Sequence, residues 1–298
     1  MSIIYHYCDL NAFISIAKNK KLWLSDATKM NDYLELKFFR NTLETEINKR
    51  LNISDEKEYI NSYIEFYNLL GLSTQIPYIC CFSTNGDLLS QWRAYGNDGK
   101  GVSIGFDKNK FPLRLPLDKD NQASDFINSN YSDDLACSYN VKSSIGFKKI
   151  DYGIDKARLK INEILSLIQL SQESSDDNVK TFTRLTAQSN ALNSTFSIKN
   201  SGFSEESEIR LIYTPLQMHK DGKICNVPNE ISSLQYRSIG DDIVSYYEYN
   251  FCYENTESPI IELVIGPKCK MTIEDVQYFL GTCGITGVKI TKAQSSYR

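Results

Sequence analysis

The sequence predicts an α+β fold on three observations. Short runs rich in β-branched and aromatic residues occur near both ends of the chain, amphipathic segments lie between them, and neither a Pro-rich linker nor an internal repeat interrupts the pattern. At 298 residues, with 41% apolar and 23% charged residues, the chain can bury a sizeable core. We expect a single mixed α/β domain over residues 1–298, with helical insertions at about 32–71 and 154–197.

Strands and helices alternate in the first third of the chain. Residues 2–7 (SIIYHY) predict a strand, residues 9–20 a helix capped by Asp9, and residues 21–25 (KLWLS) a second strand. Apolar residues at helical spacing follow from residue 32, and a second helical segment ends at Gly71. Two buried-type strands come next, "IPYICCFST" and "GVSIGFD".

The remaining two thirds continue this mixture. "FKKIDYG" predicts a strand, and residues 154–172 and 176–197 predict two helices. The acidic segment "SEESEIRLIY" at 204–213 then predicts a strand, followed by the strands "DIVSYYEY" and "IIELVIGP". A last helix, "TIEDVQYFLGTCG", is capped by Thr272 and ends at glycine.

Composition excludes several classes of protein. The net charge is −4 and the basic residues are scattered, so the sequence does not support a broad phosphate-binding surface. There is neither a signal peptide nor a run of about 20 apolar residues, which predicts a cytoplasmic protein that does not contact a membrane. With eight dispersed Cys and two His, no zinc site of known spacing can be assembled, so we expect reduced thiols and no metal.

The acidic strand raises the question of why carboxylates crowd at its start. Side chains alternate along a strand, so Glu206, Glu208 and Arg210 are expected on one face. A solvated strand edge, with Arg210 offsetting the charge, is one explanation. The other is catalysis, because a carboxylate in a cleft can stabilise an oxocarbenium cation developing on a ribose.

Polar residues of the first two strands are further candidates. His6 lies inside an apolar strand, where it is either a satisfied core histidine or a neutral imidazole bonded to a ligand hydroxyl. Ser25 ends the second strand, where it either belongs to a turn or contacts a ligand.

The segment "CFSTNGDLLSQWRAYG" contains the remaining candidates. Ser83 and Thr84 end a buried strand, so their hydroxyls either cap the next helix or contact a ligand. Trp92 and Tyr95 share one helical stripe, which suits core packing as well as stacking on a ligand ring.

Taken in order, the segments "YHY", "IAKNKKLWLSDATKMND", "CFSTNGDLLSQWRAYG", "GVSIGFD", "FSEESEIRLIY" and "IELVIGPKC" resemble an uncharacterised bacterial family often encoded among anti-phage defence genes. The signposts of that family are an N-D-P-x-E turn, a C-F-S followed by W-x-x-Y, and an E-x-E-x-R strand. This chain departs at the proline, since its turn reads Asn31-Asp32-Tyr33-Leu34-Glu35. The resemblance spans nearly the whole chain.

The same order of elements is similar to the ADP-ribosyltransferase superfamily. Its members carry a His or Arg on the first strand, a strand ending in S-T-S, and a Glu, often in E-x-E, on a later strand; His6, Ser83-Thr84 and Glu206-Ser-Glu208 match these positions. The resemblance implies a split, twisted β-core around a cleft for NAD. It also implies that His6 bonds a ribose hydroxyl, Ser83 orders the strand or Glu208, and Glu208 holds the nicotinamide ribose during cleavage.

The leading hypothesis is therefore an NAD-consuming transferase or glycohydrolase that acts as a toxin or defence effector. NAD would be its substrate, Glu208, Glu206 and His6 its catalytic residues, and Ser25, Ser83, Thr84, Trp92, Tyr95 and Arg210 further contacts to NAD. The acceptor would be a protein, a nucleic acid or water, and a regulatory or antitoxin protein would restrain the activity. Two alternatives remain: a non-catalytic nucleotide-sensing or interaction module, and a nuclease that would use Asp26, Asp32 and Glu208.

Overall fold

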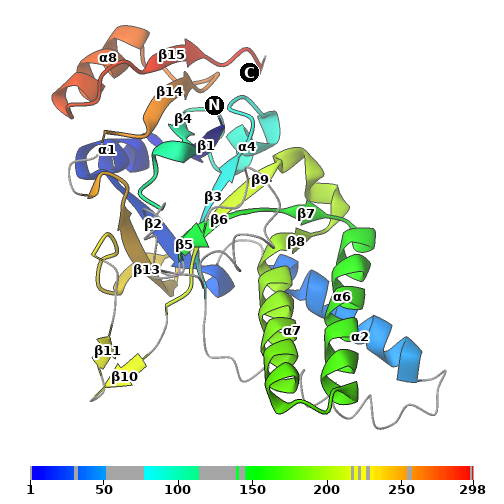
Figure 1. Cartoon of the computed structure of the whole chain (residues 1–298). Helices are drawn as coiled ribbons and strands as arrows, with labels where there is room; N and C mark the ends of the chain where they lie inside the picture. Colours follow the sequence, from blue (N-terminus) through cyan, green and yellow to red (C-terminus); the bar gives the residue numbers. More distant parts are fainter. Residues whose placement is uncertain are drawn as a thin grey trace. The chain divides into compact units, whose positions relative to one another are not determined.

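The structure, a computed structural model, describes residues 2–29, 33–51, 77–113, 139–140, 145–215, 218–220, 223–225, 229–253, 257–295 and 297 (Figure 1). The chain divides into two compact units. The first contains residues 1–27, 77–149 and 206–298, and the second contains residues 28–76 and 150–205. The second unit thus consists of the two segments in which the sequence predicts helical insertions.

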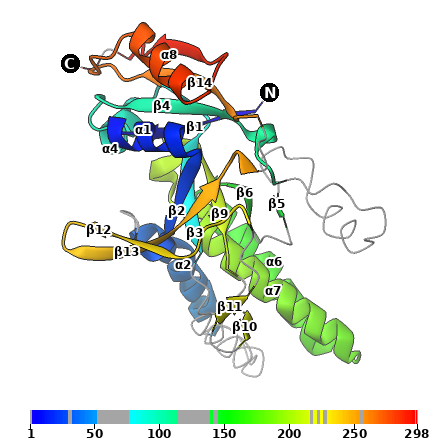
Figure 2. The same ribbon diagram turned by 90° about the vertical axis from the view of Figure 1, so that its left-hand side faces the viewer.

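The first unit is built on one large twisted sheet with short helices (Figures 1 and 2). Its strands are β1 (Ile3–Cys8), β2 (Lys21–Asp26), β3 (Tyr78–Ser83), β4 (Val102–Asp107), β5 (Tyr139–Asn140), β6 (Ile145–Lys149), β9 (Glu208–Tyr213), β12 (Gln235–Ile239), β13 (Asp242–Asn250), β14 (Ile260–Ile265) and β15 (Lys289–Lys292). Its helices are α1 (Leu10–Asn19), α4 (Leu89–Ala94), α8 (Ile273–Thr282) and the 3-10 turn η2 (Lys108–Lys110). A separate small hairpin pairs β10 (Met218–Lys220) with β11 (Lys223–Cys225).

The sheet branches at β3. One edge of β3 pairs with β9 along its whole length, and β9 pairs in turn with β6. The other edge meets β2 through Tyr78 and Ile79 at one end and β1 only through Ser83 at the other. Two arms therefore leave the same edge of β3, β2-β13-β12 and β1-β4-β14-β15. Among the described strands of this sheet, only β14 and β15 pair in parallel.

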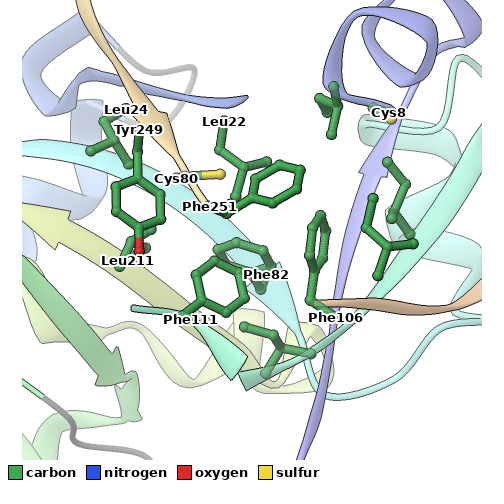
Figure 3. Close-up of a cluster of buried hydrophobic side chains, with 14 of the residues drawn as sticks. Cys8, Leu22, Leu24, Cys80, Phe82, Phe106, Phe111, Leu211, Tyr249 and Phe251 are labelled. Carbon is green, nitrogen blue, oxygen red and sulfur yellow. The ribbon is translucent and has the colours of Figure 1, made fainter. Parts of the chain in front are cut away.

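One face of this sheet carries the main hydrophobic core. Alternate residues of the central strands, including Leu22, Cys80, Phe82, Phe106 and Leu211, pack together with Phe111, Tyr249 and Phe251 (Figure 3). The rings of Phe82 and Phe106 meet edge to face with centroids 5.8 Å apart. Helices α1 and α8 cover the same core through Phe13, Ala17, Val276 and Leu280.

Local signals in the sequence fix both helices. Asp9 caps α1, where its carboxylate accepts a hydrogen bond from Ala12 N at 2.8 Å. Thr272 and Asp275 form a reciprocal capping box at the start of α8. The opposite face of the sheet carries α4, whose Trp92 packs with Tyr7 and Val264 in a smaller cluster. This second face carries the polar residues described below.

The second unit is mainly helical. It contains α2 (Tyr33–Leu51), α6 (Ile154–Glu173), α7 (Asp177–Ser197), the short parallel strands β7 (Asp151–Tyr152) and β8 (Ile198–Lys199), and the 3-10 helix η3 (Ser201–Glu206), which ends at the boundary of the first unit. A smaller 3-10 turn, η1 (Ala27–Lys29), lies where the chain passes from the first unit to the second. The core of the unit is formed by Phe39, Leu43, Ile161, Ile164 and Ala187. Figure 1 shows α6 and α7 as long neighbouring helices.

The prediction of a mixed α/β fold is confirmed. Helices α6 and α7 occupy the region predicted at 154–197, and α2 occupies the first part of the region predicted at 32–71; residues 52–76 lie outside the described part of the chain. None of the helices in the described ranges is long and apolar enough to cross a membrane.

Candidate functional site

Six residues occupy paired positions on six neighbouring strands. Ser83 of β3 pairs with Tyr5 of β1 on one side and with Glu208 of β9 on the other. Beyond Tyr5, the pairing continues through Gly105 and Glu262 to Lys289. Because paired residues of neighbouring strands point to the same face, Lys289, Glu262, Gly105, Tyr5, Ser83 and Glu208 form one cross-strand row on the face opposite the main core.

Ser83 fixes the start of β9. Its buried hydroxyl donates to the carbonyl of Glu206 at 2.7 Å and accepts from the backbone N–H of Asn85 at 3.1 Å. The backbone N–H of Thr84 donates to the carbonyl of Ser207 at 3.0 Å. Ser207 itself has a φ of 46°, in the left-handed region that non-glycine residues seldom adopt. These bonds hold a sharp backbone turn directly before Glu208.

Glu208 and Arg210 form a buried ion pair on the same face. Arg210 Nε lies 2.6 Å from Glu208 Oε1, and Arg210 Nη2 lies 3.0 Å from Glu208 Oε2, so the guanidinium holds both carboxylate oxygens. Their side chains are only 6% and 8% exposed, in that order. Cys81 pairs with Arg210 across the sheet, and burial, reinforced by the negative charge of Glu208, raises the pKa of its thiol well above the usual range. This thiol is therefore not a nucleophile at neutral pH.

A second carboxylate lies at the other end of the row. Glu262 Oε2 accepts from the hydroxyl of Tyr5 at 2.8 Å, and Glu262 Oε1 lies 2.8 Å from Lys289 Nζ. Burial alone would raise the pKa of Glu262, but the hydrogen bonds from Lys289 and Tyr5 outweigh it and lower the pKa. For Tyr5, burial and then the bond to Glu262 raise the pKa. The carboxylate is therefore ionised and the phenol protonated at neutral pH.

Two glycines make room for Tyr5. A Cβ at Gly86 would lie 2.5 Å from Tyr5 Cε1, and a Cβ at Gly105 would lie 3.1 Å from the same atom and 2.9 Å from the Cβ of Glu262. The ring thus fits against backbone on both sides, in a space that any side chain would fill.

Hydrogen bonds connect the loop after β3, residues 84–88, to two other parts of the chain. The hydroxyl of Tyr7 donates to the carbonyl of Asn85 at 2.8 Å and accepts from the N–H of Leu88 at 2.9 Å. Asp87 accepts from Trp92 Nε1 at 2.7 Å and from the N–H of Gln294 at 2.7 Å. The loop is therefore tied both to β1 and to the C-terminal segment.

The structure places three of the predicted site residues on the same sheet face as Ser83. Glu208 and Arg210 share its sheet face, and so does Ser25, which pairs with Ile79 of the same strand. Thr84 follows β3 directly, and its side chain is exposed. These residues come from three segments that are far apart in the sequence and meet at β3.

His6 does not join them on this face of the sheet. His6 follows Tyr5 on β1, and alternation puts its side chain on the main-core face, where its ring lies 5.6 Å from that of Phe82. His6 Nδ1 is 2.9 Å from the carbonyl of Cys81, and burial lowers the pKa of the imidazole. Tyr5, and not His6, is the residue of β1 that lies in the row.

Glu206 is also placed differently from the prediction. It ends the 3-10 helix η3, and the left-handed turn at Ser207 separates it from β9, so Glu206 and Glu208 are not neighbours on one strand face. The sequence alone does not reveal this break in the backbone, because the strand pattern of residues 204–213 looks continuous.

The aromatic candidates have separate environments. Trp92 is fully buried, its ring meets that of Tyr7 edge to face with centroids 4.8 Å apart, and its Nε1 donates to Asp87. It therefore belongs to the smaller hydrophobic cluster with Tyr7 and Val264. Tyr95 follows α4 and is 41% exposed. The structure does not bring Trp92 into the row.

Sequence reasoning missed Tyr5, Cys81, Glu262 and Lys289. The last two lie near the C-terminus and join the row only through the order of strands in the sheet. No local pattern signals such pairing. The alternation of "YHY" predicts that Tyr5 and His6 point to opposite faces of the sheet. Only the pairing of β1 with β3 shows that Tyr5 is the residue on the same face as Ser83.

The acids proposed for a nuclease do not come together. Asp26 pairs with Tyr78 and lies on the face opposite Glu208, while Asp32 is outside the described residues. Within the described ranges, no group of three or more His, Cys, Asp or Glu residues could hold a metal ion.

Comparisons with known proteins add one match. Residues 91–211 match the model of a protein family of unknown function, DUF2971. This segment includes Glu208 and Arg210 and ends within β9, but it excludes β1 and Ser83. No curated protein and no solved structure matches the chain.

Proposed function

We propose that this chain is an NAD-consuming enzyme with an ADP-ribosyltransferase-like split β-core, which cleaves the bond between nicotinamide and ribose. One observation carries the proposal: Ser83 and Glu208, which match the S-T and E-x-E motifs of that superfamily, are directly paired on one sheet face. The branching of the sheet at β3 is in keeping with a split core.

Glu208 would act on the ribose. As the bond from C1′ to the nicotinamide nitrogen breaks, its electron pair leaves with nicotinamide and C1′ becomes an oxocarbenium-like cation. A carboxylate held rigidly in a site with little water stabilises that charge more strongly than water does. Arg210 holds both oxygens of Glu208 and so fixes the orientation of the carboxylate before the reaction.

Glu206 would take the proton from the acceptor of ADP-ribose. It lies two residues before Glu208 beyond the turn at Ser207, and its backbone is fixed by Ser83. A nucleophile attacking C1′ must lose a proton, and a carboxylate next to the ribose can accept it. Water as acceptor would make the protein a glycohydrolase, and a protein or nucleic acid would make it a transferase. A cell containing such an enzyme as a toxin or defence effector would need a protein that restrains it.

The burial of the Glu208–Arg210 pair favours a second candidate. A carboxylate neutralised by a bidentate arginine and 6% exposed also suits a structural ion pair in a nucleotide-binding module without catalysis. In such a module the cross-strand row would organise the sheet, and loss of the Glu208 charge would change stability alone.

Nicotinamide release from NAD by the purified protein separates the two candidates. We expect release by the wild type, and about 10²- to 10³-fold slower release by Glu208→Gln, the range typical for loss of one stabilising group. Glu205→Gln, a change at an exposed carboxylate nearby, is the matched control. Label from NAD recovered on a component of cell extract identifies a transferase, and free ADP-ribose identifies a glycohydrolase.

Folding of the variants has to be checked independently, because Glu208→Gln weakens a buried pair. Thermal melting and calorimetric binding of NAD give this check. Absence of release by a folded wild type that binds NAD would overturn the catalytic proposal and leave the binding module. Equal rates for the wild type and a folded Glu208→Gln variant would overturn the assigned role of Glu208.

A further inference from the structure

A second polar cluster lies on the same sheet face as Ser83 and Glu208. It consists of Trp23 and Ser25 of β2, Arg237 of β12 and Tyr246 of β13, and we call it the Arg237 cluster. Tyr246 pairs with Ser25, and Ser25 pairs with Ile79 of β3. Ile79 precedes Ser83 by four residues, so the cluster and the cross-strand row share one face, separated by about 13 Å along β3 at ~3.3 Å per residue. The strands β12, β13, β2, β3 and β9 follow one another in this part of the sheet (Figure 2).

The guanidinium of Arg237 stacks on two aromatic rings. Its Cζ lies 4.7 Å from the ring centroid of Trp23 and 5.7 Å from that of Tyr246, and the two rings are 4.6 Å apart. Arg237 Nη2 donates to the hydroxyl of Ser25 at 3.0 Å. Trp23 remains 40% exposed, so part of its ring is accessible.

The positive charge of Arg237 is not matched by a described carboxylate. Glu248 shares this face, but it pairs with Lys21 at 2.7 Å. Asp26 lies on the other face. In the described part of the chain, no acidic side chain lies within ion-pair distance of Arg237, and its buried Nε has no hydrogen-bond partner. Burial lowers the pKa of this guanidinium, but arginine stays charged in proteins.

A half-buried cation without a counterion favours binding of an anion. Leaving a buried donor unpaired costs free energy, and an arginine stacked on aromatic rings still presents its fork of N–H donors to a phosphate. An accessible indole offers a face on which a base stacks at about 1–3 kcal/mol per base. The cluster thus combines a stacking surface with a phosphate-binding donor, which are the two features that recognise a nucleotide.

We propose that the Arg237 cluster binds the adenosine phosphate end of NAD, with adenine stacked on Trp23 and a phosphate on Arg237. This inference rests on the proposed function, because it extends the site from the ribose at Glu208 to the other end of the dinucleotide. A dinucleotide has two nucleoside ends joined by a pyrophosphate, and the sheet face offers two separated polar sites. Ser25, a cofactor contact predicted from the sequence, orients Arg237.

Tryptophan fluorescence tests this proposal directly. The chain has two tryptophans, and Trp92 is fully buried, so a change on ligand addition reports on Trp23. The probes are AMP, ADP-ribose, nicotinamide mononucleotide and inorganic phosphate, with excitation at a wavelength where adenine does not absorb. We expect saturable quenching by AMP and ADP-ribose, weaker binding of nicotinamide mononucleotide, and no quenching by AMP in Trp23→Phe.

Variants of the cations identify the phosphate contact. Arg237→Gln should weaken AMP binding at least 10-fold, and Arg237→Lys should restore part of it because the charge remains while the planar fork is lost. Lys21→Gln is the matched control, since Lys21 lies on β2 beside the cluster but already pairs with Glu248, and it should leave AMP binding unchanged. Glu208→Gln should also leave AMP binding unchanged, because AMP lacks the nicotinamide ribose.

The outcomes separate this proposal from the proposed function. Equal AMP affinity in the wild type and Arg237→Gln overturns the proposal, as does nicotinamide release that depends on Glu208 without any response of Trp23. Quenching by AMP that depends on Arg237, in a protein that releases no nicotinamide, supports the nucleotide site and rejects the catalytic function. Tighter, Arg237-dependent binding of a single-stranded oligonucleotide than of AMP at physiological salt overturns the assignment to NAD in favour of nucleic acid.

Discussion

Ser83 pairs directly with Glu208, yet its hydroxyl donates to the backbone carbonyl of Glu206 at 2.7 Å and not to the Glu208 carboxylate. Ser83 therefore acts on the candidate site through the backbone, by fixing the turn at Ser207 from which β9 begins. The carboxylate is oriented by Arg210. Ser83 thus sets the position of Glu208 and Arg210 sets the orientation of its carboxylate, so the two effects can be tested separately.

Ser83→Ala should destabilise the fold by about 1–3 kcal/mol, because it removes the buried hydroxyl that donates to the Glu206 carbonyl and accepts from the Asn85 N–H. Urea unfolding measures this difference. Thr84→Ala is the matched control, since the Thr84 side chain is exposed and the residue uses its backbone N–H, and it should change stability by less than about 0.5 kcal/mol. Equal effects of the two changes would show that the Ser83 hydroxyl is not the support of this turn.

Gly86→Ala should be destabilising by about 1–3 kcal/mol, because the new methyl group would lie 2.5 Å from the Tyr5 ring and force the ring or the loop to shift. Gly281→Ala, in helix α8 with no atom within 4 Å of the added carbon, should instead be neutral or stabilising by up to about 1 kcal/mol. Thermal unfolding of both variants gives the comparison. A Gly86→Ala protein as stable as the wild type would mean that Tyr5 is not confined in this slot.

Much of the fold was predictable from local patterns. Alternation and apolar runs located β1, β2, β3, β4, β13 and β14, and helical spacing located α1, α6, α7 and α8. Capping signals at Asp9 and Thr272 predicted two helix starts that the structure confirms. These features depend on interactions within a few residues, which a sequence displays directly.

The assembly of the site was less predictable, because it depends on strand pairing. Neighbouring residues of a strand point to opposite faces of the sheet. The pairing of β1 with β3 therefore places Tyr5, and not the adjacent His6, beside Ser83. The sequence pattern predicts Glu206 on the same strand as Glu208, but the left-handed turn at Ser207 ends that pattern before β9 begins. Glu262 and Lys289 reach the row only through β14 and β15, which no local motif connects to β1.

Protonation of Glu262 should contribute to the loss of folding stability at low pH. Its pKa is lower in the folded chain than in the unfolded chain, so the unfolded state binds more protons as the pH drops below about 5. The stabilisation is complete above the unfolded pKa of about 4.3 and is lost as the pH falls through the folded pKa. Urea unfolding from pH 6 to pH 3 should therefore show a shallower acid loss in Glu262→Gln than in the wild type.

Glu274→Gln provides the control for that series, because it makes the same substitution at an exposed acid outside the row. A Glu262→Gln protein with the same pH dependence as the wild type would show that Tyr5 and Lys289 do not stabilise the charged form of Glu262.

Asp87 should control whether the C-terminal segment stays in place. One of its oxygens accepts from Trp92 Nε1 and from the Ser295 hydroxyl, and the other accepts from the backbone N–H groups of Gln294 and Ser295 at 2.7 and 3.2 Å. Asp87→Asn keeps the shape but replaces one acceptor with an NH₂ donor, which then faces N–H or O–H donors. Bonds to a charged acceptor contribute about 1.5–3 kcal/mol, so we expect a loss of stability in that range.

Two measurements locate the Asp87 effect. Hydrogen exchange should become faster at the amides of Gln294 and Ser295, and the indole N–H resonance of Trp92 should shift, because both groups lose the same carboxylate. Asp155→Asn, at a carboxylate that is 93% exposed, should change neither signal. Faster exchange throughout the sheet would instead indicate global destabilisation, and unchanged exchange at Gln294 and Ser295 would show that Asp87 does not hold the C-terminal segment on the loop after β3.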